Sequence, residues 1–300
     1  MKFTSAVVGL GRVGWRWEVE DPLRPKPCTH VGAYDRHRGI DLIAVCDIDR
    51  SILDRFSQYY PDVRTYRSHM DLIKNEDVDI VSVATPASTH YSIVLDLVRH
   101  SGVRVVFCEK PLATTVGECL EMVGAAEEAG ASLAVNHTRR WWGLWRGVEK
   151  MVKHGELGEP LVFVGKFSGD WFETGVHMSD LYNWLCPGAV DYVAWRRLPY
   201  LLFDVEIYFR YGCMAVRGDM PNVEVAEVAR SERYSGYDEL LVKRVVPVNS
   251  VDYITPMFRA VDNIVQHLSS GVPVLCTGVD GMRAVEKCLE WGERYGWKVR

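Results

Sequence analysis

The residues best placed to do chemistry are Glu109 and Lys110, which Pro111 follows directly. An apolar run over residues 103–107 precedes them and predicts a buried parallel strand. The charged pair would therefore leave the sheet at its carboxyl end, where open α/β sheets bind ligands, and the proline would fix the turn. A lysine held there can reach a cofactor and a substrate together. The alternative interpretation is a surface ion pair at a strand end.

A second set of reactive side chains lies further along the chain. Glu173, His177 and Asp180 have i, i+4, i+7 spacing, which places them on one face of a helix if that helix begins early enough. Carboxylates beside an imidazole orient it and can form a proton relay. The spacing also resembles half of a metal site, but the sequence has no matching ligand cluster elsewhere, so we expect no metal. The other interpretation is a solvated helix face.

A glycine motif indicates what the first site would bind. Gly9, Gly11 and Gly14 form a G-x-G-x-x-G pattern directly after a predicted strand over residues 3–8. Such glycines allow a tight turn and a close approach of backbone to a pyrophosphate at a helix start. We therefore expect these glycines, with Arg12 and Val13, to contact a dinucleotide. A plain strand–helix turn is the alternative.

Asp47 ends the next predicted strand, over residues 41–46. An acidic residue there commonly binds the ribose hydroxyls and favours NAD, whereas Arg50 lies close enough to meet the 2′-phosphate of NADP. A strand-end cap is the alternative role for Asp47. Its distance from the glycine motif exceeds the usual spacing because residues 21–28 form a proline-rich insertion. This insertion is a candidate cover for the cofactor or substrate mouth.

Further site candidates follow the later strands. Thr85 and Pro86 come after the predicted strand 78–84 and would bring backbone against the cofactor. His90 falls in the first turn of the next predicted helix, where it either lines the cofactor site or packs locally. His30 follows Thr29, a predicted helix N-cap, and we interpret it as packed locally.

The order of predicted elements indicates an α/β protein with two domains. Strands and helices alternate up to residue 138, which predicts an N-terminal Rossmann domain with a doubly wound parallel sheet. Alternating apolar and polar residues later in the chain predict a mostly antiparallel, open sheet. We therefore expect a dinucleotide-binding domain over 1–138 and a C-terminal α+β domain over 139–300, which binds substrate.

Composition narrows the class of partner. The 300 residues carry a formal net charge of −5, which argues against binding nucleic acid or an anionic membrane. The eight cysteines are scattered without a C-x-x-C pair, as expected for reduced thiols in a cytoplasmic protein. The first residues predict a strand rather than a signal peptide, and no apolar stretch is long enough to span a membrane.

Taken together, the motifs resemble those of the glucose–fructose oxidoreductase / inositol dehydrogenase / MocA (Gfo/Idh/MocA) family of NAD(P)-dependent oxidoreductases. They follow the family's order and span nearly the whole chain. The matching elements are Gly9-x-Gly11-x-x-Gly14, Thr85-Pro86 with His90, Glu109-Lys110-Pro111, Asn136 with Arg139-Arg140, Gly155-x-Leu157-Gly158 and His177-x-x-Asp180. The Glu109-Lys110-Pro111 element is the most specific of these and the glycine motif the least.

The resemblance implies an enzyme that oxidises a hydroxyl group of a sugar or cyclitol, or runs the reverse reduction, with NAD or NADP. It also implies a homodimer or homotetramer formed through the C-terminal sheet. Lys110 corresponds to the family's active-site lysine, and His177 to its catalytic acid/base. Where the family often has an aspartate, this chain has Glu173, whose carboxylate would tune His177. Asp180 corresponds to a position that contacts substrate or supports the histidine.

Candidates for gripping a polar substrate are Asn136, Arg139, Arg140 and Trp171. For the last three, structural ion pairs and packing are the alternative. Two other functions remain open: a glycoside hydrolase or lyase that oxidises its substrate transiently with tightly held NAD, and a non-catalytic NAD-binding sensor.

Overall fold

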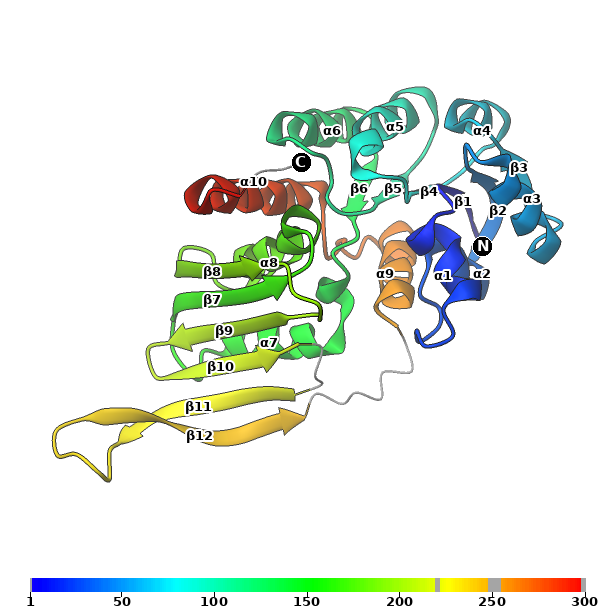
Figure 1. Ribbon diagram of the computed structural model, residues 1–300. Coiled ribbons are helices and arrows are strands. Elements are labelled where there is room, and N and C mark those ends of the chain that lie inside the picture. Colours follow the sequence, from blue (N-terminus) through cyan, green and yellow to red (C-terminus); the bar gives the residue numbers. More distant parts are fainter. Residues whose placement is uncertain (1, 219–221, 248–254, 298–300) are drawn as a thin grey trace. The chain divides into compact units, whose positions relative to one another are not determined.

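The computed structural model describes residues 2–218, 222–247 and 255–297 (Figure 1). The chain forms two compact units, each drawn from two stretches of sequence. Unit one combines Met1–Trp141 with Ile254–Glu286, and unit two combines Trp142–Tyr253 with Lys287–Arg300. The first boundary lies close to the expected one at residue 138. The return of 254–286 to unit one departs from the expected division, because hydrophobic periodicity does not show which unit a helix joins.

Unit one is built on a parallel sheet whose described strands follow the order β3-β2-β1-β4-β5-β6. These strands are β1 (Phe3–Val8), β2 (Ile40–Cys46), β3 (Arg64–Tyr66), β4 (Ile80–Val83), β5 (Val105–Cys108) and β6 (Ser132–Val135). This is the doubly wound Rossmann order, in which ligands bind beyond the carboxyl ends of β1 and β4, where the strand order reverses. The predicted parallel sheet is confirmed. Sequence reasoning missed β3, because its three residues form no apolar run.

Helices join these strands, and capping residues explain where several of them begin. Thr29, Asp49 and Ser68 each accept a backbone N–H of the helix that follows, and Thr115 forms a capping box with Glu118. The helical segments are η1 (Arg12–Arg16), α1 (Trp17–Glu20), α2 (His30–Arg36), α3 (Arg50–Tyr59), α4 (His69–Asn75), α5 (Ala87–His100), α6 (Val116–Glu128), η2 (Thr138–Trp141) and α9 (Pro256–Ser270). Figure 1 shows α5 and α6 side by side, and α9 packs against α2 and η2. Among the described residues, no helix is long and apolar enough to cross a membrane.

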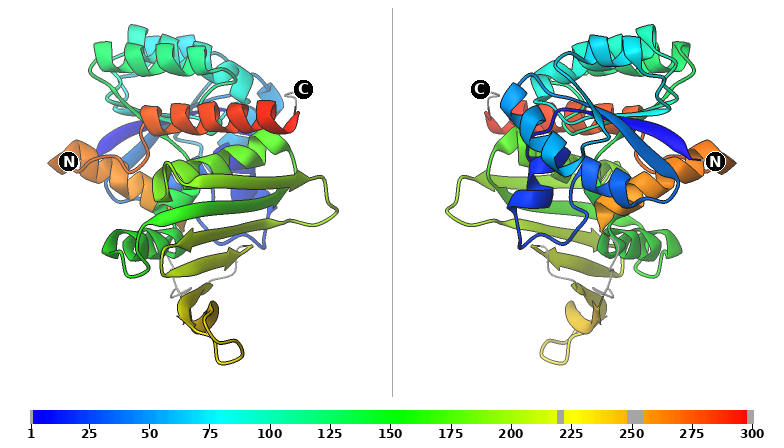
Figure 2. Two further views of the ribbon diagram at one scale, coloured as in Figure 1. Left: turned by 90° about the vertical axis from the view of Figure 1, so that its left-hand side faces the viewer. Right: turned by 90° about the vertical axis from the view of Figure 1, so that its right-hand side faces the viewer.

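Unit two contains the predicted antiparallel sheet, with the described strands in the order β12-β11-β10-β9-β7-β8. They are β7 (Pro160–Ser168), β8 (Val190–Arg196), β9 (Phe203–Phe209), β10 (Gly212–Arg217), β11 (Asn222–Arg230) and β12 (Asp238–Pro247). β7 and β8 pair in parallel, and the other neighbours are antiparallel. The β11–β12 hairpin extends beyond the part of β11 that pairs with β10 (Figures 1 and 2).

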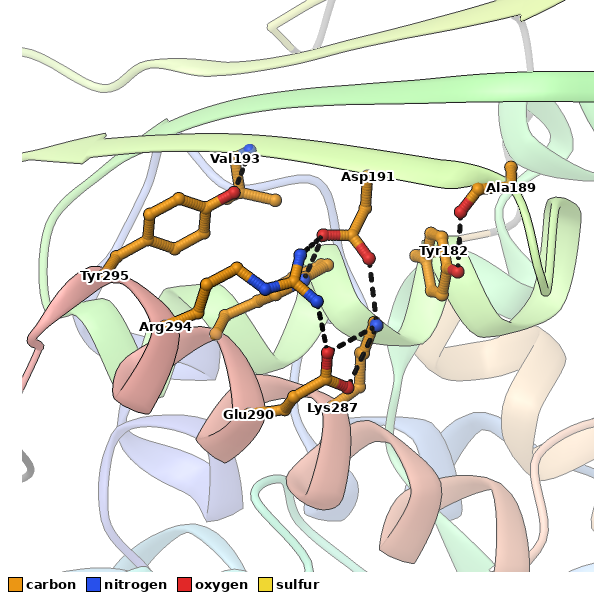
Figure 3. A network of polar contacts seen from close by, with 9 residues as sticks. Tyr182, Ala189, Asp191, Val193, Lys287, Glu290, Arg294 and Tyr295 are labelled. Carbon is orange, nitrogen blue, oxygen red and sulfur yellow. Dashed lines mark hydrogen bonds and ion pairs between the residues drawn. The ribbon is translucent and has the colours of Figure 1, made fainter.

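Unit two contains the helices α7 (Gly143–His154) and α8 (Trp171–Leu185). The last part of α10 (Gly278–Tyr295), from Lys287 onward, also belongs to this unit. An ionic cluster around the buried Asp191 fixes that part of α10 to β8 (Figure 3). Asp191 on β8 accepts a hydrogen bond from Trp291 Nε1 at 3.0 Å and pairs with Lys287 Nζ at 2.9 Å and with Arg294. Glu290 pairs with the same two cations. The helix is therefore held by charge as well as by the packing of Trp291 on Phe163.

Candidate functional site

The glycine loop after β1 has the geometry of a dinucleotide cradle. Gly9 has φ +95°, and a Cβ atom there would lie 2.6 Å from the carbonyl oxygen of Ala84. A Cβ atom on Gly14 would lie 2.0 Å from the carbonyl oxygen of Gly9. At Gly11, by contrast, a Cβ atom would meet nothing within 4 Å. Packing thus explains the first and third glycines, and the second leaves space for a group that must approach the backbone closely.

Arg12 and Val13 begin the π-helical turn η1, and Trp15 and Arg16 donate their N–H groups to the carbonyl oxygen of Gly11. The first N–H groups of a helical segment have no acceptor within that segment, so they are available to an anion. The predicted helix after the glycine loop is present, but it ends at Glu20, before the proline-rich insertion.

Asp47 lies against this loop. One oxygen of its carboxylate accepts the N–H of Leu10 at 2.7 Å, and the other accepts the N–H of Asp49 at 2.9 Å. The side chain therefore caps two segments of backbone and still has acceptor capacity for a ligand. Arg50, at the exposed start of α3, lies 3.8 Å from Asp54.

The turns after β4 and β5 are linked by His90. Its Nε2 atom lies 2.8 Å from the carbonyl oxygen of Thr85, and its Nδ1 atom lies 2.9 Å from that of Pro111. The ring is buried at the start of α5, for which Pro86 is the N-cap. His90 thus ties the Thr85-Pro86 turn to the Lys110-Pro111 turn, and a direct contact with a cofactor stays a prediction.

Glu109 is buried at this edge of the sheet, with 8% of its surface exposed. Its carboxylate contacts His30 Nε2 at 3.0 Å and accepts a hydrogen bond from Asn136 Nδ2. Burial acts to raise the pKa of Glu109. The hydrogen bond and charge of His30, the hydrogen bond from Asn136 and the charge of Lys110 outweigh it and hold that pKa below its usual value. Glu109 is therefore an ionised, acceptor-only group. Lys110 itself is half-buried, and its N–H lies 3.4 Å from Glu109 Oε2.

The predicted substrate residues after β6 fall into different environments. Asn136 is 1% exposed, and its Oδ1 atom has no hydrogen-bond partner among the described residues. Arg140 is buried and pairs with Asp280 Oδ1 at 3.2 Å, which fixes the start of α10 within unit one. This ion pair gives Arg140 a structural role, and a substrate contact stays a prediction. Arg139 is half-buried in η2.

In unit two, the second predicted set lies on α8. Asp170 caps this helix by accepting the N–H groups of Phe172 and Glu173, so the helix begins early enough to include Glu173. From Glu173 through His177 to Asp180 the side chains pass from exposed through half-buried to buried. The predicted common helix face is therefore present, with the imidazole at the boundary between core and solvent.

Trp171 lies at the start of the same helix, but in an aromatic cluster. Its ring packs against Phe172 and Trp297, with centroid distances of 5.6 and 6.0 Å. A Cβ atom on Gly292 would lie 2.6 Å from the Trp171 ring, so α10 approaches it closely. This packing accounts for the side chain without a ligand, and a substrate contact stays a prediction.

Sequence reasoning underestimated one group of residues in unit one. His30, interpreted as locally packed, contacts Glu109 across 79 positions of sequence, and it also contacts Ser82 on β4. Tyr34 completes this group by contacting Ser82. The available signal was a serine inside an otherwise apolar strand, which needs a hydrogen-bond partner when buried.

Comparisons with known proteins agree with this geometry. Residues 3–137 match the GFO_IDH_MocA oxidoreductase family with an NAD-binding Rossmann fold. Inositol 2-dehydrogenase of Burkholderia multivorans is 31% identical over 207 residues, which are 65% of this chain and 57% of the relative. D-apiose dehydrogenase of Paraburkholderia graminis is 33% identical over 140 residues, which are 47% of this chain and 36% of the relative. The chain thus spans about half the length of the curated relatives it matches.

Solved structures show the same fold over almost the whole chain. The WlbA dehydrogenase from Bordetella pertussis, solved with NADH and UDP-GlcNAcA, has a TM-score of 0.75 at 18% identity and covers 99% of this chain and 98% of its own. UDP-N-acetylglucosamine 3-dehydrogenase GnnA from Acidithiobacillus ferrooxidans has a TM-score of 0.73 at 18% identity, with coverage of 97% and 96%.

The strand order and the glycine cradle define a dinucleotide-binding protein of the Rossmann class. This domain is an NAD-binding Rossmann fold, and residues 3–137 match the model of the Gfo/Idh/MocA oxidoreductase family. The resemblance inferred from the motifs is confirmed.

Proposed function

We propose that the protein is an NAD(P)-dependent oxidoreductase that transfers a hydride between nicotinamide and a hydroxyl-bearing carbon of a sugar, cyclitol or sugar derivative. The observation that carries the proposal is the convergence of the glycine cradle, Asp47 and the Glu109-Lys110 turn on one edge of the Rossmann sheet. The relatives named for inositol and apiose oxidation support the substrate class.

The residues at this edge fit a dinucleotide. The open side of Gly11 and the first N–H groups of η1 would hold the pyrophosphate, and Asp47 would accept hydrogen bonds from ribose hydroxyls. NAD is the expected cofactor, and Arg50 keeps NADP as the alternative. When bound, the nicotinamide supplies the hydride-accepting or hydride-donating chemistry.

In the proposal, side chains of the protein transfer the hydroxyl proton and stabilise the charge that develops on the reacting oxygen. In the proposal, Lys110 donates a hydrogen bond to the reacting oxygen and stabilises negative charge as it develops. His177 takes or returns the hydroxyl proton, and Glu173 orients the imidazole from the preceding turn of α8. Asn136 supports substrate binding, because its buried Oδ1 atom can accept a hydrogen bond from a hydroxyl group. Arg139, Arg140, Trp171 and Asp180 are the other candidates for substrate contacts.

The proposal includes a homodimer or homotetramer formed through the sheet of unit two. Apolar side chains on its strands support this, since Tyr192, Val228 and Val245 are exposed on β8, β11 and β12. The molar mass measured by light scattering after size-exclusion chromatography tests it.

The central experiment separates cofactor binding from turnover. Wild-type protein is mixed with NAD⁺ or NADP⁺ and with myo-inositol, D-apiose or UDP-N-acetylglucosamine, and absorbance is followed at about 340 nm. We expect Lys110→Ala and His177→Ala to lower kcat/KM at least about 100-fold. The cofactor affinity of both variants should stay within about threefold of wild type. Lys74 is an exposed lysine on α4, and Lys74→Ala should keep kcat/KM and cofactor affinity within the same range.

Two outcomes would favour the rival functions. Turnover of substrate without a lasting absorbance change would favour transient oxidation by a hydrolase or lyase. Cofactor binding without turnover of any tested substrate would favour a sensor.

A pair of glycine variants locates the cofactor. Gly11→Ala should fold normally but bind the cofactor weakly, whereas Gly14→Ala should destabilise the loop, because its methyl group would meet Gly9. Normal cofactor affinity in Gly11→Ala would place the dinucleotide elsewhere.

A further inference from the structure

A buried chain of hydrogen bonds runs from α2 to the Glu109-Lys110 turn. The hydroxyl oxygen of Tyr34 lies 2.6 Å from Ser82 Oγ, and Ser82 Oγ lies 2.8 Å from His30 Nδ1. The other ring nitrogen of His30 lies 3.0 Å from Glu109 Oε1. Tyr34, Ser82 and His30 are fully buried, so these groups depend on one another for hydrogen bonds.

The ionised state of Glu109 sets the direction of this chain. A carboxylate only accepts hydrogen bonds, so His30 Nε2 must carry a proton. Burial raises the pKa of Tyr34 far above its usual value, and its phenol stays protonated. Tyr34 then donates to Ser82, Ser82 donates to Nδ1, and Nε2–H donates to Glu109. The direction of donation therefore runs from Tyr34 through Ser82 and His30 to Glu109.

The proline-rich insertion determines where His30 lies. The carboxylate of Glu18 on α1 accepts the N–H of Cys28 at 3.0 Å and the hydroxyl of Thr29 at 3.1 Å. Thr255, the N-cap of α9, donates its hydroxyl to the carbonyl oxygen of Pro27 at 2.5 Å. The end of the insertion is thus tied on two sides, and Thr29 then caps the helix that starts at His30.

Two buried histidines therefore bracket Lys110. On one side, His30 holds Glu109, whose Oε2 atom lies 3.4 Å from the backbone nitrogen of Lys110. On the other side, His90 holds the carbonyl oxygen of Pro111. The backbone that carries Lys110 is fixed through both neighbours, and one of these two supports depends on the insertion.

We infer that His30 is a positioning residue for Lys110, acting through Glu109, and that the proline-rich insertion serves as the strut that places it. The inference rests on the proposed role of Lys110. It assigns the insertion a role inside the Rossmann unit, in place of the expected cover over the cofactor or substrate mouth. His30 itself touches neither cofactor nor substrate, so its loss should affect kcat far more than cofactor affinity.

Two substitutions at His30 test this directly. His30→Leu removes both hydrogen bonds and should lower kcat roughly 10- to 100-fold, the effect expected for losing a hydrogen bond to a charged group. His30→Gln keeps an N–H donor near the position of Nε2 and should recover most of that loss. In both variants the affinity for NADH, measured by its fluorescence, should stay within about threefold of wild type. The substrate is whichever of myo-inositol, D-apiose and UDP-N-acetylglucosamine the wild type oxidises.

His69→Leu is the matched control, because His69 also contacts a carboxylate, Asp96 at 2.9 Å, on the surface of the same unit. It should leave kcat unchanged. A purely structural role for His30 would lower the melting temperature of both His30 variants and leave the kcat of the folded enzyme at the wild-type value. Equal kcat in His30→Leu and wild type would overturn the inference while leaving the proposed function intact.

A measurement without turnover decides the hydrogen-bond chain. In ¹⁵N-imidazole NMR spectra near neutral pH, Nε2 of His30 should be protonated and Nδ1 should be an acceptor, with the signals assigned by their loss in His30→Gln. Ser82→Ala should shift the Nδ1 signal. A protonated Nδ1 would overturn the chain. If wild type turns over none of the three substrates, the proposed function fails, and the role of Lys110 fails with it. The NMR spectra test the hydrogen-bond chain independently of turnover.

Discussion

Each unit buries a carboxylate, and the two are neutralised differently. Asp191 in unit two contacts two cations, Lys287 and Arg294, which lie two turns apart on α10 (Figure 3). Glu109 in unit one accepts hydrogen bonds from His30 and Asn136 at the carboxyl end of a parallel sheet. Asp191 therefore meets the charges of a lysine and an arginine inside its cluster, whereas Glu109 accepts hydrogen bonds from a histidine and an amide and has Lys110 as its neighbour.

This difference distinguishes a carboxylate that holds a helix from one that supports a site. A buried ion pair is costly to break because the partner charges are left behind in the core. A carboxylate that accepts hydrogen bonds from a histidine and an amide stays ionised beside a lysine, so its charge can act on that lysine. The same residue type thus serves stability in unit two and, in our proposal, the placement of Lys110 in unit one.

The largest expected effect is on the stability of unit two. Asp191→Asn leaves Lys287 and Arg294 with Glu290 alone and should lower the free energy of unfolding by about 3 to 5 kcal/mol, nearer the lower value because Glu290 remains. Urea denaturation measures this. The control is Asp238→Asn, whose exposed pair with Arg230 should cost less than about 1 kcal/mol. Similar losses in both variants would show that the cluster does not hold α10.

The next effect concerns acid stability and a third carboxylate, Glu206. Burial acts to raise its pKa, but Tyr208, Arg217 and Lys166 outweigh it and lower the pKa to about 2. Because this lies below the ordinary value of 4.5, Glu206 stabilises the fold above that pH, and the contribution is lost as pH falls from 4.5 toward 2. The loss should be roughly 3 kcal/mol.

Denaturant titrations across this pH range compare wild type with Glu206→Gln. The variant should be less stable near neutral pH and should lose less stability on acidification. Parallel stability curves for the two proteins would contradict this. If the two curves converge on acidification as expected, unit two contains two carboxylates that are paired with cations, which sharpens the contrast with Glu109.

The smallest expected change in stability, and the one that would break the comparison, is at Glu109. Glu109→Gln keeps an acceptor for His30 and no longer buries a charge, so the free energy of unfolding should change by less than about 1 kcal/mol. The kcat value should nevertheless fall roughly 10- to 100-fold, since Lys110 loses its charged neighbour. A stability loss as large as that of Asp191→Asn, with kcat unchanged, would make Glu109 a structural carboxylate as well.

Much of the fold could be predicted because its signals are local. The strand at Phe3–Val8 was predicted with its observed ends, and Thr29 caps α2 as expected. The end of α7 at Gly155 follows from its φ of +71°, which glycine adopts without strain. The return of α9 to unit one was not predicted, since an amphipathic helix has the same pattern whichever core it covers.

The sequence by itself determined which residues stand at the carboxyl ends of the Rossmann strands. The alternation of strands and helices and the glycine motif are short-range patterns, and both can be recognised in the sequence. It thereby placed the glycines, Asp47 and Glu109-Lys110 at one edge. Only the tertiary structure decided what lies beneath that edge. His30 reaches Glu109 from 79 residues away, and Arg140 finds Asp280 on α10, because hydrogen bonds and ion pairs depend on distance in space. No sequence spacing encodes such contacts.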